Sequence, residues 1–362
     1  QCASACPTGA AGYDLPPADA TMRGVRRMVR AYAAGGGADA LILFHDRAHG
    51  TELIDALARF GPGLPAYVLP VEVEETTSVG PETVLAALAW GATGVGLLTR
   101  ARPRHDIRGL AQTVALTDAV ATGFGYGAGV VRVLAFDDPD ALRSALDEFP
   151  PGEASRAPAS FEPRGRKRDL LNVTLAELHA AAPAPTPHIE LAEGAPLGGL
   201  SIDTGGCTLC LSCVGVCPTG ALGDDAERPL LSFDESLCVQ CGLCAAPCPE
   251  KVIALTPRLD FEARAAGRVT VKTEEPALCV ACGKAFGSKS SIERVAAKLA
   301  GHWMYRDDPA RLDVVRMCED CRIQKSVAEG FDPHGAPDRP RVRTAQDYLR
   351  ERDAGTDELG EA

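Results

Sequence analysis

Eight cysteines between residues 207 and 248 recur at a spacing that suits a metal centre. The two segments that carry them read CTLCLSCVGVCPTGAL and CVQCGLCAAPCPEKVI. In each segment three cysteines stand two residues apart, and a fourth follows after three more residues with a proline behind it. Thiolates at this spacing hold [4Fe–4S] clusters, and the fourth cysteine of each run reaches the neighbouring cluster. The pattern therefore predicts two one-electron redox centres.

The geometry of such a cluster predicts how the thiolates are shared. Three thiolates on one tight loop can face three irons of a cube, so the fourth ligand must come from another part of the fold. The first set is Cys207, Cys210, Cys213 and Cys248, and the second is Cys238, Cys241, Cys244 and Cys217. Disulfides or zinc are the alternative use of these cysteines, although zinc usually takes two separated pairs of ligands.

Prolines, glycines and acidic residues accompany the cysteines. Pro218 and Pro249 should stop regular helix and turn the chain away from the metal. Gly215, Gly220 and Gly242 are expected to allow close backbone approach, so that N–H groups point at sulfur. Negative charge nearby disfavours an added electron, so the surrounding carboxylates predict low reduction potentials. These are Asp203, Asp224, Asp225, Glu227, Asp234 and Glu235.

A second metal site is predicted closer to the C-terminus. Two Cys-x2-Cys pairs, Cys279 with Cys282 and Cys318 with Cys321, are the usual ligands of a tetrahedral four-thiolate site, most often zinc. Gly283 follows the first pair, where a knuckle folds the backbone over the sulfurs. The spacing leaves a rubredoxin-type iron centre and a redox-active dithiol as alternatives. We expect a structural zinc site.

The first residues repeat part of the cysteine pattern. Cys2 and Cys6 are separated by three residues, and Cys6 is followed by Pro-Thr-Gly-Ala, as Cys217 is. We therefore expect residues 1–16 to be the remnant of a truncated [4Fe–4S] motif. In that case both cysteines would serve a further upstream [4Fe–4S] cluster only in a full-length protein. The alternative is a chance match at a true N-terminus.

Outside the cysteine runs, strand and helix patterns alternate between residues 20 and 150. Alternation of this kind predicts a Rossmann-like or flavodoxin-like α/β domain, with a parallel sheet between helices. Strands are expected at 40–45, 66–73, 94–98 and 130–136, and helices at 51–60 and 81–91. No dinucleotide fingerprint or Walker lysine motif is present. His45 and His49 follow the first strand, where ligands bind in such sheets, but we interpret them as residues that cap a turn.

The remaining segments complete an α/β and α+β multidomain organisation. Residues 151–196 are rich in proline and basic residues, which indicates a solvated linker with one amphipathic helix at 169–181. Residues 197–258 are assigned to a bacterial 2[4Fe–4S] ferredoxin domain, and residues 259–330 to a small helical domain around the four-cysteine knuckle. Residues 331–362 are polar and are expected to form a loosely held tail.

Composition narrows the classes of function. The net charge of −12 argues against nucleic acid, whose phosphates need a basic surface, and suits a basic partner protein. No run of about twenty apolar residues occurs, so no membrane span is predicted, and no signal peptide is recognisable. Cysteines are absent between Cys6 and Cys207, unlike in a disulfide scaffold. Thiolate-held clusters favour a reducing compartment, so we expect the cytoplasm.

The C-terminal half resembles a family of cytoplasmic multi-cluster ferredoxin-like proteins of proteobacteria that are associated with formate dehydrogenase systems. The resemblance rests on the two cysteine runs and on CGKAFGSKSSIERVAAKLAGH followed by MCEDCR. The phrase GPETVLAALAWGATGVGLL is similar to a unit of the iron–sulfur (delta) subunit of hydrogenases linked to heterodisulfide reductase. That family carries a [2Fe–2S] cluster, whereas this region has no cysteine. Both resemblances imply electron transfer to or from a larger redox enzyme, formate dehydrogenase-like or hydrogenase-like.

The predicted activity is outer-sphere transfer of single electrons through two [4Fe–4S] clusters. An accessory factor that carries clusters or cofactor for the assembly of an oxidoreductase is the alternative. No nucleophile with a neighbouring base is evident, and no Cys-x3-Cys-x2-Cys radical motif occurs. We therefore predict an electron-transfer component without a catalytic site of its own.

Overall fold

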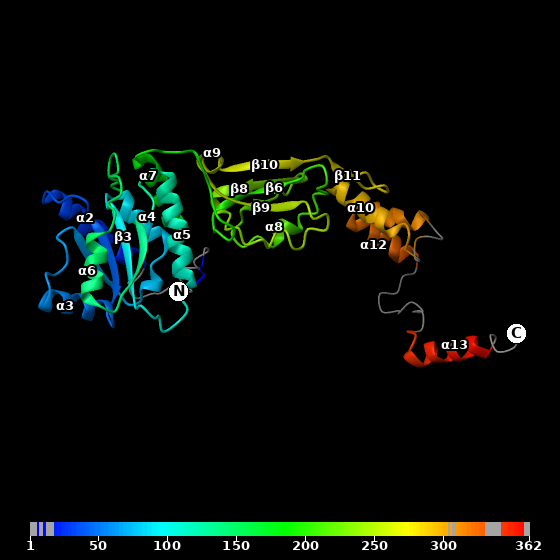
Figure 1. Cartoon of the computed structure of the whole chain (residues 1–362). Helices are drawn as coiled ribbons and strands as arrows, with labels where there is room; N and C mark the ends of the chain where they lie inside the picture. Colours follow the sequence, from blue (N-terminus) through cyan, green and yellow to red (C-terminus); the bar gives the residue numbers. More distant parts are fainter. Residues whose placement is uncertain are drawn as a thin grey trace. The chain divides into compact units, whose positions relative to one another are not determined.

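A parallel sheet lies at the centre of the N-terminal part, and its strands follow the order β2-β1-β3-β4. The strands are β1 (Leu41–Asp46), β2 (Val68–Val73), β3 (Gly94–Thr99) and β4 (Val131–Ala135). They lie where the sequence predicts strands, and their order is the flavodoxin-like one of doubly wound folds. The computed structural model in Figure 1 describes residues 6, 10–11, 18–302, 305, 309–329 and 342–357.

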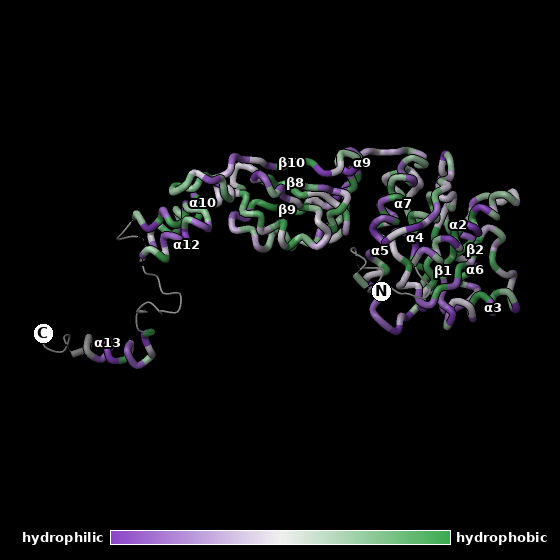
Figure 2. Tube along the Cα trace, turned by 180° about the vertical axis from the view of Figure 1, so that it is seen from behind, coloured by the Kyte–Doolittle hydropathy of each residue, from purple (hydrophilic) through white to green (hydrophobic). Residues whose placement is uncertain are grey.

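Helices cover both faces of this sheet. They are α2 (Ala18–Ala34), α3 (Gly50–Phe60), α4 (Pro81–Ala89), α5 (Arg108–Gly123) and α6 (Pro139–Asp147). Leu41 and Leu43 of β1 belong to the core beneath α3 and α6, whereas Ile42 and Phe44 belong to the core beneath α2, α4 and α5. Burial on both faces explains why β1 is a continuous apolar run instead of an alternating one. Figure 2 shows this hydrophobic interior.

The segment after β4 belongs to the same core, which corrects the expectation of a solvated linker. Helix α7 (Lys167–Ala181) packs against α4. Its buried apolar residues are Leu170, Leu171, Leu175 and Leu178. Ahead of the helix, Phe161 lies 5.1 Å from Trp90 between ring centroids. Arg168, predicted to be solvated, is only 9% exposed. The basic run therefore contains a buried cation.

The cysteine runs are held between two small antiparallel sheets. One has the order β5-β9-β6 and the other β10-β8-β7. The strands are β5 (His188–Glu190), β6 (Gly198–Ile202), β7 (Leu222–Gly223), β8 (Leu230–Asp234), β9 (Ile253–Asp260) and β10 (Arg268–Thr273). The first run joins β6 to β7 and the second joins β8 to β9. Strand β6 pairs with β9, and β7 pairs with β8. The start of each run therefore lies beside the end of the other.

Strand β10 sets the end of this part. The sequence places residue 259 onward in the four-cysteine domain, but β10 pairs with β8. The chain accordingly divides into two compact units between Thr273 and Glu274. Short helices complete the first unit, namely α8 (Ser212–Gly215), η2 (Glu235–Leu237) and α9 (Phe261–Ala265), with η1 (Thr76–Ser78) in its α/β part.

The second unit is a hairpin followed by helices. It contains β11 (Pro276–Leu278), β12 (Ala285–Ser288), α10 (Lys289–Leu299), η3 (Pro309–Arg316), α12 (Glu319–Ala328) and α13 (Ala345–Asp357). Helix α10 begins at an N-cap, because the Ser288 side chain accepts a hydrogen bond from the Ser291 N–H. The polar tail predicted for 331–362 contains helix α13 within its described residues.

Candidate functional site

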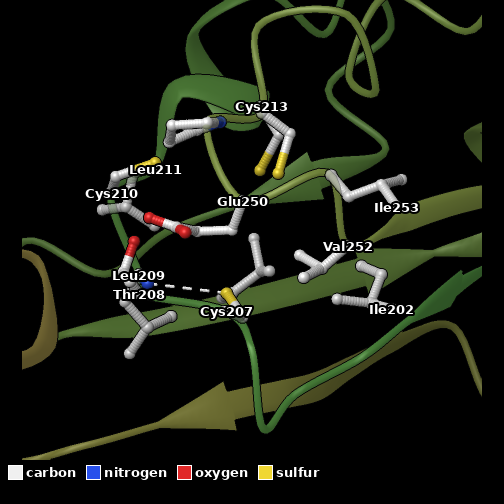
Figure 3. A pocket seen from close by; sticks show the side chains of 13 residues that line it. Ile202, Cys207, Thr208, Leu209, Cys210, Leu211, Cys213, Glu250, Val252 and Ile253 are labelled. Carbon is white, nitrogen blue, oxygen red and sulfur yellow. Dashed lines mark hydrogen bonds between the residues drawn. The ribbon is translucent and has the colours of Figure 1, made fainter. Parts of the chain in front are cut away.

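The first pocket lies beside β6 and is drawn in Figure 3. Cys207, Cys210 and Cys213 reach it from the first run, and Cys248 reaches it from the second. It encloses about 380 Å³ of empty space, part of it open to solvent. Figure 3 shows the Cys207 and Cys213 sulfurs facing one another across this space. The remaining wall is mostly apolar, formed by Ile202, Leu209, Leu211, Leu231, Val252 and Ile253.

The second pocket has the same construction with the two runs exchanged. Cys238, Cys241 and Cys244 reach it from the second run, and Cys217 reaches it from the first. It encloses about 320 Å³ of empty space. Its apolar wall includes Leu200, Ala221, Leu222, Phe233, Val239 and Leu255. The structure thus brings together the two sets of cysteines that the spacing groups.

Both loops repeat one backbone conformation. Left-handed φ angles occur two and four residues after the first cysteine of each run, and three residues after the last. These positions are Leu209 (51°), Leu211 (59°) and Gly220 (66°) in the first run, and Gln240 (54°), Gly242 (74°) and Lys251 (54°) in the second. Such angles cost a residue with a side chain roughly 1–2 kcal/mol. The loops are therefore held in a strained shape that curls the chain around each pocket.

Hydrogen bonds to sulfur accompany these turns. The Leu209 N–H donates to Cys207 Sγ at 3.5 Å, and Gln240 Nε2 donates to Cys238 Sγ at 3.4 Å. The expectation of glycines at close approaches is not supported at Gly215 or Gly220, where an added Cβ would meet no protein atom within 4 Å. Gly215 lies inside α8 without a left-handed φ. Gly220 and Gly242 adopt the left-handed angles that favour glycine.

The thiols have pKa values that reflect their burial. Burial, aided by neighbouring thiolates, raises the pKa of Cys213 and of Cys244 to about 11. Burial also opposes ionisation of Cys217, but N–H groups of Leu222 and Thr219 outweigh it and lower the pKa. A buried thiol with a raised pKa stays protonated at neutral pH, whereas a coordinated one loses its proton. Soft sulfur donors in apolar pockets fit an iron–sulfur cluster.

Each pocket also has a cation on the carbonyl oxygen of its first cysteine, which the sequence analysis did not identify. Lys272 Nζ of β10 donates to Cys207 O at 2.5 Å. The Arg168 guanidinium of α7 donates to Cys238 O at 2.6 Å. A sequence signal for Arg168 existed, because it shares helical spacing with Leu171 and Leu175 on the apolar face of α7.

The acidic residues are less uniform than the sequence analysis assumed. Glu235 is buried, and Arg258 forms a bidentate ion pair with it at 2.7 and 3.1 Å. Its charge is therefore compensated. Glu250 lines the first pocket, and the backbone oxygen of Asp203 accepts from the Cys207 N–H at 3.1 Å. One carboxylate side chain, that of Glu250, therefore belongs to the wall of the first pocket.

The second unit holds the cysteine pairs together. The Sγ atoms of Cys279, Cys282, Cys318 and Cys321 all lie within 4.8 Å of one another. Cys282 Sγ is 3.7 Å from Cys318 Sγ. Metal–sulfur bonds of about 2.3 Å in a tetrahedron place sulfurs about 3.8 Å apart, so this spacing suits a single ion. Gly283 has a φ of 75° and closes the turn predicted for a knuckle.

Backbone groups prepare this site for a cation. The Cys318 N–H donates to Cys279 Sγ at 3.2 Å. Desolvation opposes ionisation of Cys279, but N–H groups of Cys318, Cys282 and Ala281 outweigh it and lower its pKa to about 6. At neutral pH this thiolate is therefore available as a ligand.

The other candidate residues are Cys2, Cys6, His45 and His49. Cys2 is outside the described residues, and Cys6 lines neither cysteine pocket. His45 and His49 are buried at the end of β1. The His49 N–H donates to Asp46 Oδ1 at 2.6 Å, and its Nε2 lies 3.0 Å from Asp137 Oδ1. These contacts agree with the interpretation of a polar turn.

Comparison with known proteins points to the same stretch. Residues 206–253 match the family described as 4Fe-4S dicluster domain. A segment of 47 residues is 47% identical to the indolepyruvate oxidoreductase subunit IorA of Archaeoglobus fulgidus. The segment covers 13% of this chain and 7% of that protein. Both matches support an iron–sulfur domain for electron transfer. Among the described helices, none has the length and apolar character needed to cross a membrane.

Proposed function

We propose that this protein relays single electrons through two [4Fe–4S] clusters to or from a larger redox enzyme. The interleaving of the cysteines supports this most directly. Each pocket takes three thiols from one run and its fourth from the other, as cluster pairs of this kind require. A disulfide framework or two zinc knuckles would not need that exchange.

The ligands we assign are those that line each pocket. Cys207, Cys210, Cys213 and Cys248 hold one cluster, and Cys238, Cys241, Cys244 and Cys217 hold the other. Bound clusters supply one-electron chemistry in which no bond is made or broken. The protein's own part is to keep the thiolates fixed, exclude water with apolar walls and donate N–H groups to sulfur.

The partner we propose is a formate dehydrogenase-like or hydrogenase-like enzyme in a reducing compartment, the cytoplasm. Its support is the sequence resemblance, together with the similarity of a 47-residue segment to an oxidoreductase subunit. In each pocket one proposed ligand is exposed, Cys210 in the first and Cys241 in the second. These exposed sulfurs are the closest approach for an electron donor and an acceptor.

For the second unit we propose one structural Zn²⁺ ion held by Cys279, Cys282, Cys318 and Cys321. The sulfur separations support a mononuclear tetrahedral site. The unit is small and its apolar residues are sparsely buried, so a metal would supply folding free energy that its core does not.

Metal analysis of protein purified without oxygen tests both assignments. We expect equal amounts of iron and acid-labile sulfide, since each [4Fe–4S] cluster contains four of both, and one zinc per chain. The Cys279→Ser variant should lose zinc and keep its iron. The matched Cys241→Ser variant should lose or alter one cluster and keep its zinc.

Three results would oppose these assignments in different ways. Colourless protein without labile sulfide would remove the electron relay altogether. Clusters that pass readily to an apo-acceptor, without reduction during turnover of the partner enzyme, would favour the assembly-factor alternative. Iron that disappears in the Cys279→Ser variant would show that the second unit is not a zinc site.

A further inference from the structure

Arg168 of α7 is a buried cation that faces the second cysteine run. Its guanidinium donates to Ser236 O at 3.0 and 3.1 Å, to Cys238 O at 2.6 Å and to Pro196 O at 3.0 Å. Only 9% of the residue is exposed. Each of these acceptors is a backbone carbonyl, and Cys238 is the first cysteine of its run.

A buried guanidinium needs a counter-charge, because transfer of an ion out of water is costly without one. Burial lowers the pKa of Arg168 to about 10, and the nearby Arg264 opposes its charge as well. The interaction that favours the charge comes from Cys238, at the start of the second run. Among the described residues, no carboxylate forms an ion pair with Arg168. Arg168 is therefore a desolvated cation that contacts the backbone of the first cysteine of the second run.

Helix α7 holds a second guanidinium beside the same run. Asn172 accepts a hydrogen bond from Arg264 at 2.6 Å, and its amide lies 3.4 Å from Ser236 O. Burial lowers the pKa of Arg264, while Glu235 and Asp234 support its charge. The α/β part of the first unit therefore contributes Arg168 directly and positions Arg264.

The first pocket has a weaker arrangement of positive charge. Lys272 donates to Cys207 O at 2.5 Å and to Thr204 O at 2.8 Å, but it is half-buried and reaches solvent. The Glu250 carboxylate also lines that pocket. Water and salt screen an exposed charge much more than a buried one. The two pockets therefore differ in the field that acts on an added electron.

We propose that Arg168 raises the reduction potential of the cluster in the second pocket above that of the cluster in the first. This rests on the proposed electron relay. Reduction adds one negative charge to a cluster, and a nearby desolvated cation stabilises that charge. One electron enters from the donor enzyme and one leaves to the acceptor, without proton transfer. The α/β part then directs electrons toward the second pocket.

A redox titration of the full chain, followed by electron paramagnetic resonance, tests this. In Arg168→Gln one of the two midpoint potentials should fall by at least the equivalent of a tenfold change in equilibrium constant, which is 59 mV for one electron. Arg168→Lys keeps the charge and should recover most of the difference. Arg164→Gln removes an exposed charge from the same segment and should change neither potential.

The two signals are assigned independently of Arg168. Cys241→Ser should abolish or displace the signal of higher potential, and Cys210→Ser that of lower potential. Lys272→Gln should lower the potential assigned to the first pocket. If Arg168→Gln fails to fold, two measurements still test the inference. They are the assignment of the two potentials to the two pockets in the wild-type protein and the titration of Arg168→Lys.

Three outcomes would overturn the inference. One is a wild-type protein in which the higher potential belongs to the first pocket. Another is an Arg168→Gln variant with intact clusters and two unchanged potentials. The third is an equal fall of both potentials. Absence of clusters from the wild-type protein would instead refute the proposed function, so the two failures are distinguishable.

Discussion

Backbone conformation at single residues shapes the cysteine loops. Leu209, Gln240 and Lys251 adopt left-handed angles although they carry side chains. Nothing in their residue types signals this, because the conformation is imposed by the loop that they close. The cysteines are different, since their spacing alone groups them into the two sets that line the pockets.

Two glycines provide a clean test at the residue scale. Neither Gly215 nor Gly220 would bring an added Cβ within 4 Å of another atom, but only Gly220 has a left-handed φ. Gly220→Ala should lower the free energy of unfolding by about 1–2 kcal/mol through backbone strain. Gly215→Ala should be neutral or stabilise by up to about 1 kcal/mol, because alanine suits a helix. Anaerobic denaturant unfolding compares them, and equal effects would contradict the argument.

At the scale of elements, periodicity predicted the strands of the parallel sheet better than it predicted domain membership. The proline and arginine residues around α7 indicated a solvated linker, yet Leu171 and Leu175 pack into the core of the α/β part. Composition gives only the average polarity of a segment. Whether a helix packs against a core depends on its having one apolar face. Helices α2, α5 and α6 were also not assigned from the sequence.

Helix α7 has buried and exposed positions whose substitution should affect stability differently. Leu175 is fully buried against the core, so Leu175→Ala should destabilise the first unit by about 2–5 kcal/mol. Val173 on the same helix is 43% exposed, and Val173→Ala should cost less than about 1 kcal/mol. Thermal unfolding followed by circular dichroism separates the two. A true linker helix would tolerate both changes equally.

For the whole molecule, charge determines how partners approach. The net charge of −12 should attract an acceptor with a basic surface and speed its association at low ionic strength. Electron transfer from the reduced protein to a basic acceptor such as cytochrome c should therefore slow as salt rises toward physiological values. Stopped-flow absorbance measures this. A neutral dye as acceptor is the control, and a salt-independent rate with cytochrome c would refute electrostatic steering.

The limits of sequence reasoning are also clearest for the whole molecule. Spacing predicted three sets of cysteines, and each set lies together in the structure. The contact of Arg168 with Cys238 was beyond reach, because the two residues are 70 positions apart. Contacts of that kind depend on how the α/β part and the cysteine sheets pack.

The crossing of Cys217 and Cys248 between the pockets has a consequence for how this region can change over time. In the ligand assignment proposed above, neither run completes its site without the other. A polypeptide ending before residue 248 would still contain the first loop, yet the first pocket would lack Cys248, its fourth proposed ligand. Because each run contributes cysteines to both pockets, an insertion in either loop should disturb both of them.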